Sequence, residues 1–262
     1  MRIALCTLEA YASARAVRDF VRRDPSRIAL IILSDPFRPA MGGRVGQVRR
    51  HLARSGPAIL PYLAVNFLLP GLLCRRDRLS DLAREHNIPW HVSRDVNGAA
   101  TRAAIRAAAP DLILSFHFDQ IFRPETLQLA RLGGINVHPS VLPRHRGPIP
   151  AWYGLAEGVT GVSIHRLAER IDAGGVLVQA EVPLPAAARR SASAAAAALH
   201  DAALPLLEQA LAMLPADPPP GPLLPYCPFP DAATLRRCRR QGLRLVHWCD
   251  LPASLSAPAG GW

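Results

Sequence analysis

Residues Met1–Leu33, MRIALCTLEAYASARAVRDFVRRDPSRIALIIL, decide the fold. Residues 2–6 and 28–33 are apolar runs of strand length, and Ala10–Arg23 between them carries helix-forming residues with regularly spaced arginines. A strand, a helix and a second strand in this order are typical of a β-α-β unit, which opens a doubly wound parallel sheet. The sequence therefore predicts an α/β protein built on a mostly parallel, Rossmann-like sheet.

The rest of the chain continues this alternation. Further strands are predicted at 90–92, 111–116, 135–138, 161–165 and 176–182, and further helices at 78–86, 99–109, 151–157 and 191–214. The proline-rich stretch 215–225 predicts an irregular linker. We expect one α/β domain over residues 1–190, followed by a helical and irregular C-terminal extension over 191–262.

Composition narrows the class of protein. The formal net charge is +11 and all the basic residues are arginine, which we attribute mainly to coding bias, although a positive field also attracts polyanions. The five cysteines form no CxxC pair and no zinc-like spacing with histidine, so neither a metal site nor a disulfide framework is predicted. The N-terminus lacks the pattern of a signal peptide, which favours a cytoplasmic location.

One uncharged segment, Pro57–Cys74, leaves alternatives open. Its length is near the minimum for a membrane span, but prolines and a glycine interrupt it, and arginines flank it. A buried helix or a subunit contact, as in a homodimer, is the leading interpretation. A helix lying in a membrane surface is the second, because flanking arginines suit an acidic lipid surface.

The candidate chemistry lies in residues 133–181. Asn136 and His138 are two positions apart on a predicted strand, so their side chains share one face at its carboxyl end, where ligands bind in open α/β sheets. Asp172 follows on a glycine-rich turn. An amide can donate to an oxyanion, an imidazole can move a proton, and a carboxylate can stabilise the charged imidazole. These roles suit acyl transfer by direct attack of an amine, since no G-x-S-x-G nucleophile motif occurs.

This stretch resembles the folate-dependent formyltransferase family, which includes glycinamide ribonucleotide transformylase, methionyl-tRNA formyltransferase and the sugar N-formyltransferases. The matching pieces are Asn136–Ser140, Leu142-Pro143, Arg146-Gly147, Thr160–His165 and Ile171–Gly174. The resemblance covers about fifty residues closely and most of residues 1–190 more loosely. It implies the formyltransferase version of the Rossmann-like fold and makes Asn136, His138 and Asp172 the catalytic residues.

The same resemblance implies a co-substrate and its binding residues. Formyl transfer from 10-formyltetrahydrofolate to a primary amine is expected, with tetrahydrofolate as the second product. The segment Gln120, Ile121 and Phe122 matches the part of the family that binds the pterin ring through backbone groups. Ala168, Glu169 and Ile171 match a second folate-contacting loop. His165 matches a histidine that lines the site in the glycinamide ribonucleotide enzymes.

Differences between this sequence and the family's pattern limit the class of acceptor that is expected. Residues 6–11 contain no glycine, unlike the phosphate-binding loop of the glycinamide ribonucleotide enzymes, and the extension lacks the strand pattern of the initiator-tRNA enzymes' β-barrel. A nucleotide-linked amino sugar or another small amine is therefore the expected acceptor, with Arg144 and Arg146 as candidate phosphate contacts. A tRNA acceptor, and a nucleic-acid or membrane-surface binding protein on the same scaffold, stay as alternatives.

Overall fold

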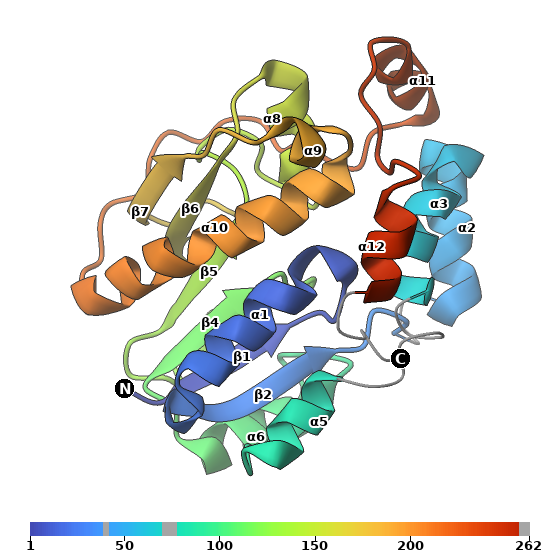
Figure 1. The fold of residues 1–262 in the computed structure, drawn as a ribbon. Coiled ribbons are helices and arrows are strands. Elements are labelled where there is room, and N and C mark those ends of the chain that lie inside the picture. The colour runs from blue at the N-terminus through green and yellow to red at the C-terminus, as the bar shows by residue number, and fades with distance from the viewer. Residues whose placement is uncertain (39–41, 70–77, 257–262) are drawn as a thin grey trace.

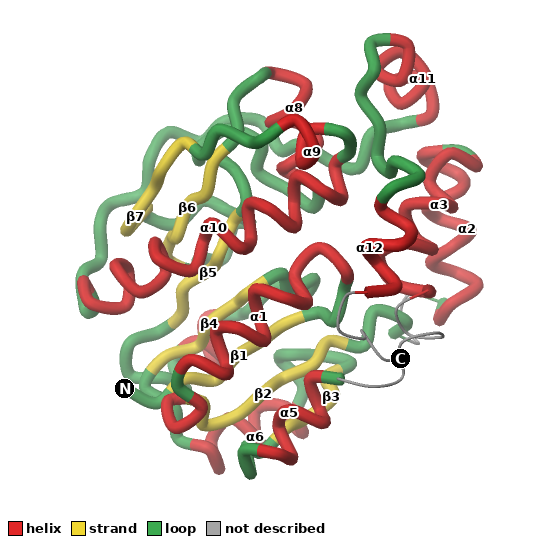
Figure 2. Tube along the Cα trace, viewed as in Figure 1, coloured by secondary structure: helices red, strands yellow, loops and turns green. Residues whose placement is uncertain are grey.

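A computed structural model describes residues 1–38, 42–69 and 78–256, which form a sheet flanked by helices (Figures 1 and 2). The sheet has seven strands in the order β3-β2-β1-β4-β5-β6-β7. The strands are β1 (Ile3–Thr7), β2 (Ile28–Ser34), β3 (Trp90–Ser93), β4 (Leu112–Phe116), β5 (Gly134–His138), β6 (Gly161–Arg166) and β7 (Val176–Glu181). All pairs from β3 to β5 are parallel, whereas β6 is antiparallel to both of its neighbours. The predicted mostly parallel α/β sheet is confirmed.

Each face of the sheet is covered by helices, because alternate residues of the central strands are apolar on both faces. On one face, Ile3 and Leu5 belong to a core with α1 (Tyr11–Arg23), α5 (Leu79–Glu85) and α10 (Ala192–Met213). On the other face, Ala4 and Cys6 pack in a core with Ile105 of α6 (Ala99–Ala108). Figure 1 shows α1 and α10 running side by side over the same face of the sheet.

Four further elements are short and lie at the ends of the strands. They are the turn η1 (Pro25–Arg27) and the helices α7 (Pro124–Leu127), α8 (Pro150–Glu157) and α9 (Ala186–Arg189). The predicted helix 151–157 is confirmed within one residue. Gly158 ends α8 in the left-handed conformation that glycine adopts without a steric penalty.

A helical block that the sequence did not predict as such lies beside the sheet (Figure 1). It begins with α2 (Gly43–Ser55), which was missed, and continues through η3 (Pro57–Ile59), α3 (Leu60–Leu63) and the π turn η4 (Ala64–Leu68). The last three elements fall in the predicted segment 57–74, of which residues 70–74 lie outside the described residues. Ile59, Tyr62 and Val65 are buried, in agreement with the leading interpretation. None of the described helices is long and apolar enough to cross a membrane.

The C-terminal extension returns to this block. After the irregular stretch from residue 215, α11 (Ala232–Arg240) contacts α2, and α12 (Asp250–Ser256) contacts η4. A third apolar cluster joins Tyr62, Trp152 and Leu235, which come from the helical block, α8 and α11 respectively. The predicted combination of helix and irregular extension is confirmed, and α11 and α12 are two further helices that were not predicted.

Candidate active site

Three neighbouring strands bring polar side chains together at one edge of the sheet. Ser115 of β4, Asn136 of β5 and His165 of β6 lie opposite one another in register. Ser115 Oγ donates to Asn136 Oδ1 at 2.6 Å, which fixes the orientation of the amide. His165 Nδ1 donates to the carbonyl oxygen of Arg166 at 2.8 Å, so its Nε2 accepts from Asn136 Nδ2 at 3.0 Å. An amide nitrogen carries two hydrogens, and the second can be donated to an oxygen in the cleft.

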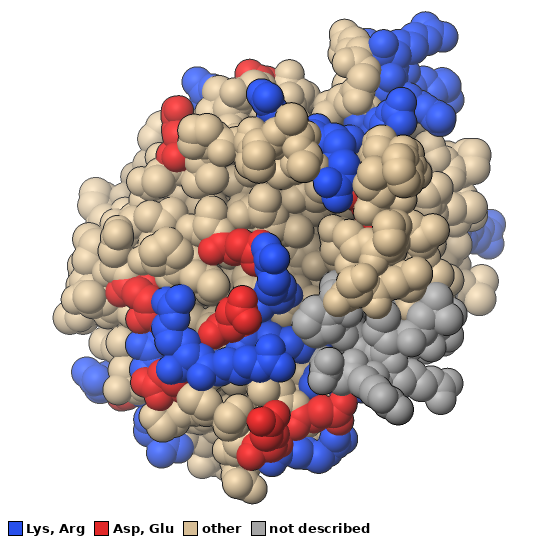
Figure 3. Space-filling view, viewed as in Figure 1, with Lys and Arg blue, Asp and Glu red and all other residues tan. Residues whose placement is uncertain are grey.

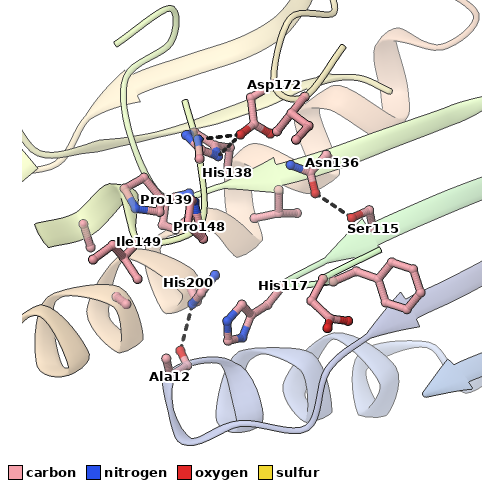
Figure 4. Close-up of a pocket in the computed structure, with 18 of the residues that line it drawn as sticks. Ala12, Ser115, His117, Asn136, His138, Pro139, Pro148, Ile149, Asp172 and His200 are labelled. Atoms are coloured by element: carbon pink, nitrogen blue, oxygen red, sulfur yellow. Dashed lines mark hydrogen bonds and ion pairs between the residues drawn. The ribbon is translucent and has the colours of Figure 1, made fainter. Parts of the chain in front are cut away.

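His138 and Asp172 complete this edge, as predicted (Figure 4). His138 is buried at the end of β5, and its Nε2 lies 3.2 Å from the carbonyl oxygen of His145. Because a carbonyl oxygen only accepts, Nε2 carries the hydrogen in the neutral ring, and Nδ1 is the basic nitrogen. Nδ1 lies 3.7 Å from Asp172 Oδ2. The same carboxylate lies 3.6 Å, through Oδ1, from His165 Nε2.

The electrostatic environment of His138 and Asp172 suits His138 as a proton acceptor. Burial lowers the pKa of His138, and the neighbouring Asp172 opposes that shift without cancelling it. Burial alone would raise the pKa of Asp172, but the neighbouring His138 and His165 rings and the hydrogen bond from the Gly147 amide bring it down to about 2. Asp172 is therefore ionised and His138 neutral at pH 7. A proton that reaches His138 Nδ1 is stabilised by a carboxylate already in place.

The position of Asp172 depends on Arg146. Asp172 has φ of 50°, an uncommon conformation for a residue with a side chain, and Gly147 N donates to its Oδ2 at 2.9 Å. The buried Arg146 guanidinium donates to the carbonyl oxygens of Ile171 at 2.9 Å and Asp172 at 3.2 Å. It also donates to the carbonyl oxygen of Leu224 at 2.8 Å. Arg146 thus positions the turn that carries Asp172, a role that sequence reasoning missed; its contact with an acceptor stays a prediction.

The residues predicted to bind folate fall into two groups. Gln120, Ile121 and Phe122, together with Ala168 and Ile171, line the cleft of about 260 Å³ beside Asn136 and His138. The Gln120 side chain accepts from Val96 N and donates to Ser34 Oγ and the carbonyl oxygen of Ser93, which fixes the position of this residue. The cleft does not include Glu169 and Arg144, which are exposed.

Two histidines that were not assigned a role also line this cleft. His117, at the end of β4, has its Nδ1 2.7 Å from Ser13 Oγ, and burial lowers its pKa to about 3. His200 of α10 lies 2.8 Å, through Nδ1, from the carbonyl oxygen of Ala12, and burial lowers its pKa to about 4. His200 Nδ1 must therefore be the donor, which leaves a lone pair on Nε2, a buried atom without a hydrogen-bond partner (Figure 4). The available signal for His200 was a histidine followed by Asp201 within an alanine-rich helix.

The arginines lie elsewhere. Among the described residues, no arginine lines the cleft, and no group of three His, Cys, Asp or Glu is arranged to hold a metal. Figure 3 shows basic side chains gathered over α11, which carries Arg236, Arg237, Arg239 and Arg240, and mixed with acidic ones over α1 and its neighbours. Apart from buried residues such as Arg18 and Arg146, the arginines seen in this view thus lie on the surface of the protein.

Comparison with known proteins finds curated relatives and solved structures that are similar to this chain. Over 85 residues the chain is 44% identical to a methionyl-tRNA formyltransferase of Treponema denticola, a match that covers 32% of this chain and 26% of that protein. The chain thus spans about a quarter of the length of this relative. A sugar N-formyltransferase from Shewanella sp. FDAARGOS_354 shares the fold, with a TM-score of 0.55 and 17% identity over 97% of this chain and 87% of that one.

A second structure with the same fold is WlaRD, a sugar 3N-formyl transferase determined in the presence of dTDP and 5-N-formyl-THF. Its TM-score is 0.54, with 13% identity over 87% of this chain and 70% of that one. A profile of the family described as Formyl transferase matches residues 78–211, which include all three predicted catalytic residues. This match extends over more than half of the sequence, and the chain therefore belongs to the formyl transferase family.

Proposed function

We propose that this protein transfers the formyl group of 10-formyltetrahydrofolate to a primary amine. The observation that carries the proposal is the convergence of Asn136, His138 and Asp172 at one edge of the sheet, with His138 Nδ1 3.7 Å from the carboxylate. The amine nitrogen attacks the formyl carbon, and the second hydrogen of the Asn136 amide is donated to the developing oxyanion. The bond from the formyl carbon to N10 then breaks, giving a formamide and tetrahydrofolate.

Proton movement in this scheme involves His138 and Asp172. The amine becomes acidic as its bond to carbon forms, and His138 Nδ1 takes its proton. The ionised Asp172 stabilises the resulting imidazolium, which then gives the proton to the N10 leaving group as it departs, and His138 returns to its neutral form. No side chain needs to form a covalent intermediate. Because Asp172 is held through backbone contacts of Arg146 and Gly147, the carboxylate does not have to reorganise when the charge appears.

The assignment of a folate as the formyl donor rests on the same cleft. The segment Gln120–Phe122 and the loop residues Ala168 and Ile171 supply backbone and apolar surface beside the catalytic residues, as a flat pterin ring requires. The structure of WlaRD in the presence of 5-N-formyl-THF supports a folate as the donor of the fold family. We retain Glu169 as a proposed contact at the rim of the donor site, since it adjoins Ala168.

An amino sugar is the proposed acceptor class, because both solved sugar enzymes share the fold. A tRNA acceptor has less support: the match to the Treponema protein covers about a quarter of it, and the described residues after α10 contain helices and no strand. Arg144 and Arg146 would be the acceptor's phosphate contacts. Neither the exposed Arg144 nor Arg146, which binds backbone carbonyls, lines the cleft. This weakens the case for a nucleotide-linked form.

The function is tested by incubating the protein with 10-formyltetrahydrofolate and a panel of amines. The panel contains free amino sugars, nucleotide-linked amino sugars and simple alkylamines. Tetrahydrofolate release and a formamide product, both dependent on the amine, are the expected result. The His138→Ala variant is the control for chemistry that needs no active site. Release no faster than in that variant, for every amine tested, would refute the proposal.

A further inference from the structure

A second cavity adjoins the catalytic cleft. Its volume is about 550 Å³, and its walls come from the helical block and the C-terminal extension, with Val48, Leu63, Ala64, Phe67 and Phe229 among its apolar lining residues. His51 of α2 packs edge-on against Phe229, with ring centroids 5.0 Å apart, which closes one side. The cavity is therefore built mainly from elements outside the seven-stranded sheet.

The two spaces adjoin. Both are lined by Tyr62, His117, Phe118, Asp119 and Pro148, so these residues lie between the catalytic cleft and the apolar cavity. Figure 4 shows His117 and His200 between Ala12 and the catalytic residues, on the side of the cleft away from Asp172. The unpartnered lone pair of His200 Nε2 suits an N–H donor such as an amine. The polar end of an acceptor would lie there.

The charges in the larger cavity do not suit a phosphate. Within the described part of the chain no arginine lines it, and its one acidic residue, Asp119, forms an ion pair with Arg38. Burial and the neighbouring Arg50 lower the pKa of His51, so this ring is neutral at pH 7. A phosphate would leave water without a cation to compensate it, which is costly, whereas an apolar group gains free energy on leaving water.

We infer that the acceptor is a primary amine that carries an aliphatic group, and that this group occupies the apolar cavity while the amine lies at His138 and His200. The inference rests on the proposed formyl transfer to a primary amine, and it departs from the amino-sugar acceptor that the fold neighbours suggest. An apolar tail that fills the cavity positions the nitrogen against the formyl carbon through binding energy gathered away from the reacting atoms. A nucleotide-linked sugar of the same length would place its diphosphate against Phe67 and Phe229.

The test uses n-alkylamines with two, four, six and eight carbons, each below the concentration at which it aggregates. Both kcat/KM for formylation and the binding constant from calorimetry are measured. Each methylene that enters the cavity is expected to raise both by about fourfold, until the cavity is full. The calorimetric binding should also show a negative change in heat capacity. Binding that does not depend on chain length would overturn the inference.

A matched pair of variants on α2 locates the effect. Val48 lines the cavity, whereas Val45 is 81% exposed on the same helix and does not. Val48→Asp places a charge in the apolar wall and should reduce the increase in kcat/KM and in the binding constant per methylene. Ala64→Phe fills part of the cavity, so this increase should stop at a shorter alkyl chain. Val45→Asp should keep the wild-type dependence on chain length. If Val48→Asp and Val45→Asp showed the same dependence on alkyl chain length, the alkyl group would bind outside this cavity and the inference would be wrong.

The outcomes separate this inference from the proposed function. If no amine releases tetrahydrofolate, the proposed function fails, while calorimetry still reports whether alkyl chains bind. If short and long amines are formylated equally well, the function stands and the aliphatic acceptor is wrong. A nucleotide-linked amino sugar formylated with a higher kcat/KM than octylamine would also overturn the inference.

Discussion

The catalytic cleft and the apolar cavity differ in how the chain builds them. The cleft takes Ser115, Asn136 and His165 from neighbouring strands in register, so backbone pairing alone brings them together. The cavity takes its walls from α2, η4 and the C-terminal extension, and Val48 and Phe229 are far apart in the sequence. The arrangement of the cleft therefore follows from strand pairing within the sheet, whereas the proposed choice of acceptor depends on packing between helices and loops outside the sheet. Substitutions in the two regions should have different kinetic signatures.

The largest effect is expected for His138→Ala. Loss of the proton acceptor should lower kcat by about a hundredfold or more, and by the same factor for short and long alkylamines. Steady-state kinetics with two chain lengths measure this. A variant that kept near wild-type turnover would remove His138 from the mechanism. A loss confined to the long amine would show that the cleft and the cavity are not separate in function.

A comparable loss is expected for Asn136→Ala, about a hundredfold in kcat, because the donor to the oxyanion is removed. Ser115→Ala sharpens the assignment, since Ser115 only orients the Asn136 amide through a 2.6 Å hydrogen bond. Its loss should be smaller and should also lie in kcat. Equal rates for Asn136→Ala and the wild type would assign the oxyanion to another donor.

The histidines at the junction of the two regions should make the fold sensitive to acid. The folded-state pKa of His200 is depressed to about 4, so its neutral form contributes stability that is complete above the ordinary pKa. This contribution is lost as the pH falls from about 6.5 towards 4, by about 2 kcal/mol at pH 5. Urea unfolding between pH 7 and 5 measures it, with His200→Gln expected to flatten the dependence. If the free energy of unfolding of His200→Gln changed with pH as steeply as that of the wild type, His200 would not be buried as a neutral ring.

A smaller effect, about tenfold in kcat at pH 7, is expected for Asp172→Asn, which would remove the charge that stabilises protonated His138. Asp172 raises the pKa of His138 against the larger effect of burial, so its neutralisation should lower that pKa further. The acid limb of the kcat profile should then move to lower pH. If the acid limb of the kcat profile moved to higher pH instead, a group other than His138 would be responsible for that limb.

Much of the fold and the catalytic core could be predicted from the sequence. The β-α-β opening and the strand that ends in Asn136-x-His138 have regular apolar patterns, and both are confirmed. Helix α2 was missed because Gly43 and Gly46 lower its helix propensity and its arginines give no clear apolar stripe. It is held instead by tertiary contacts, such as the hydrogen bond from Ser55 Oγ to the carbonyl oxygen of Pro230.

Side-chain roles were harder to predict than side-chain positions. The sequence placed Arg146 in the loop after β5, but could not reveal that its guanidinium reaches carbonyl oxygens of Ile171 and Leu224. His200 joins the cleft only because α10 packs on α1 and brings its ring to the carbonyl oxygen of Ala12. Both contacts link residues far apart in the chain, so no local pattern indicates them.

The contacts of Arg146 give the irregular stretch after α10 a mechanical link to catalysis. The guanidinium that holds the Asp172 turn also holds Leu224, and the Arg146 carbonyl oxygen accepts from Cys227 N at 2.7 Å. A Cβ on Gly147 would lie 2.2 Å from the carbonyl oxygen of Cys227, so the two backbones can meet only where a glycine stands. Shortening or cleaving residues 222–228 would therefore loosen the carboxylate while leaving the sheet intact, and activity would be lost before stability.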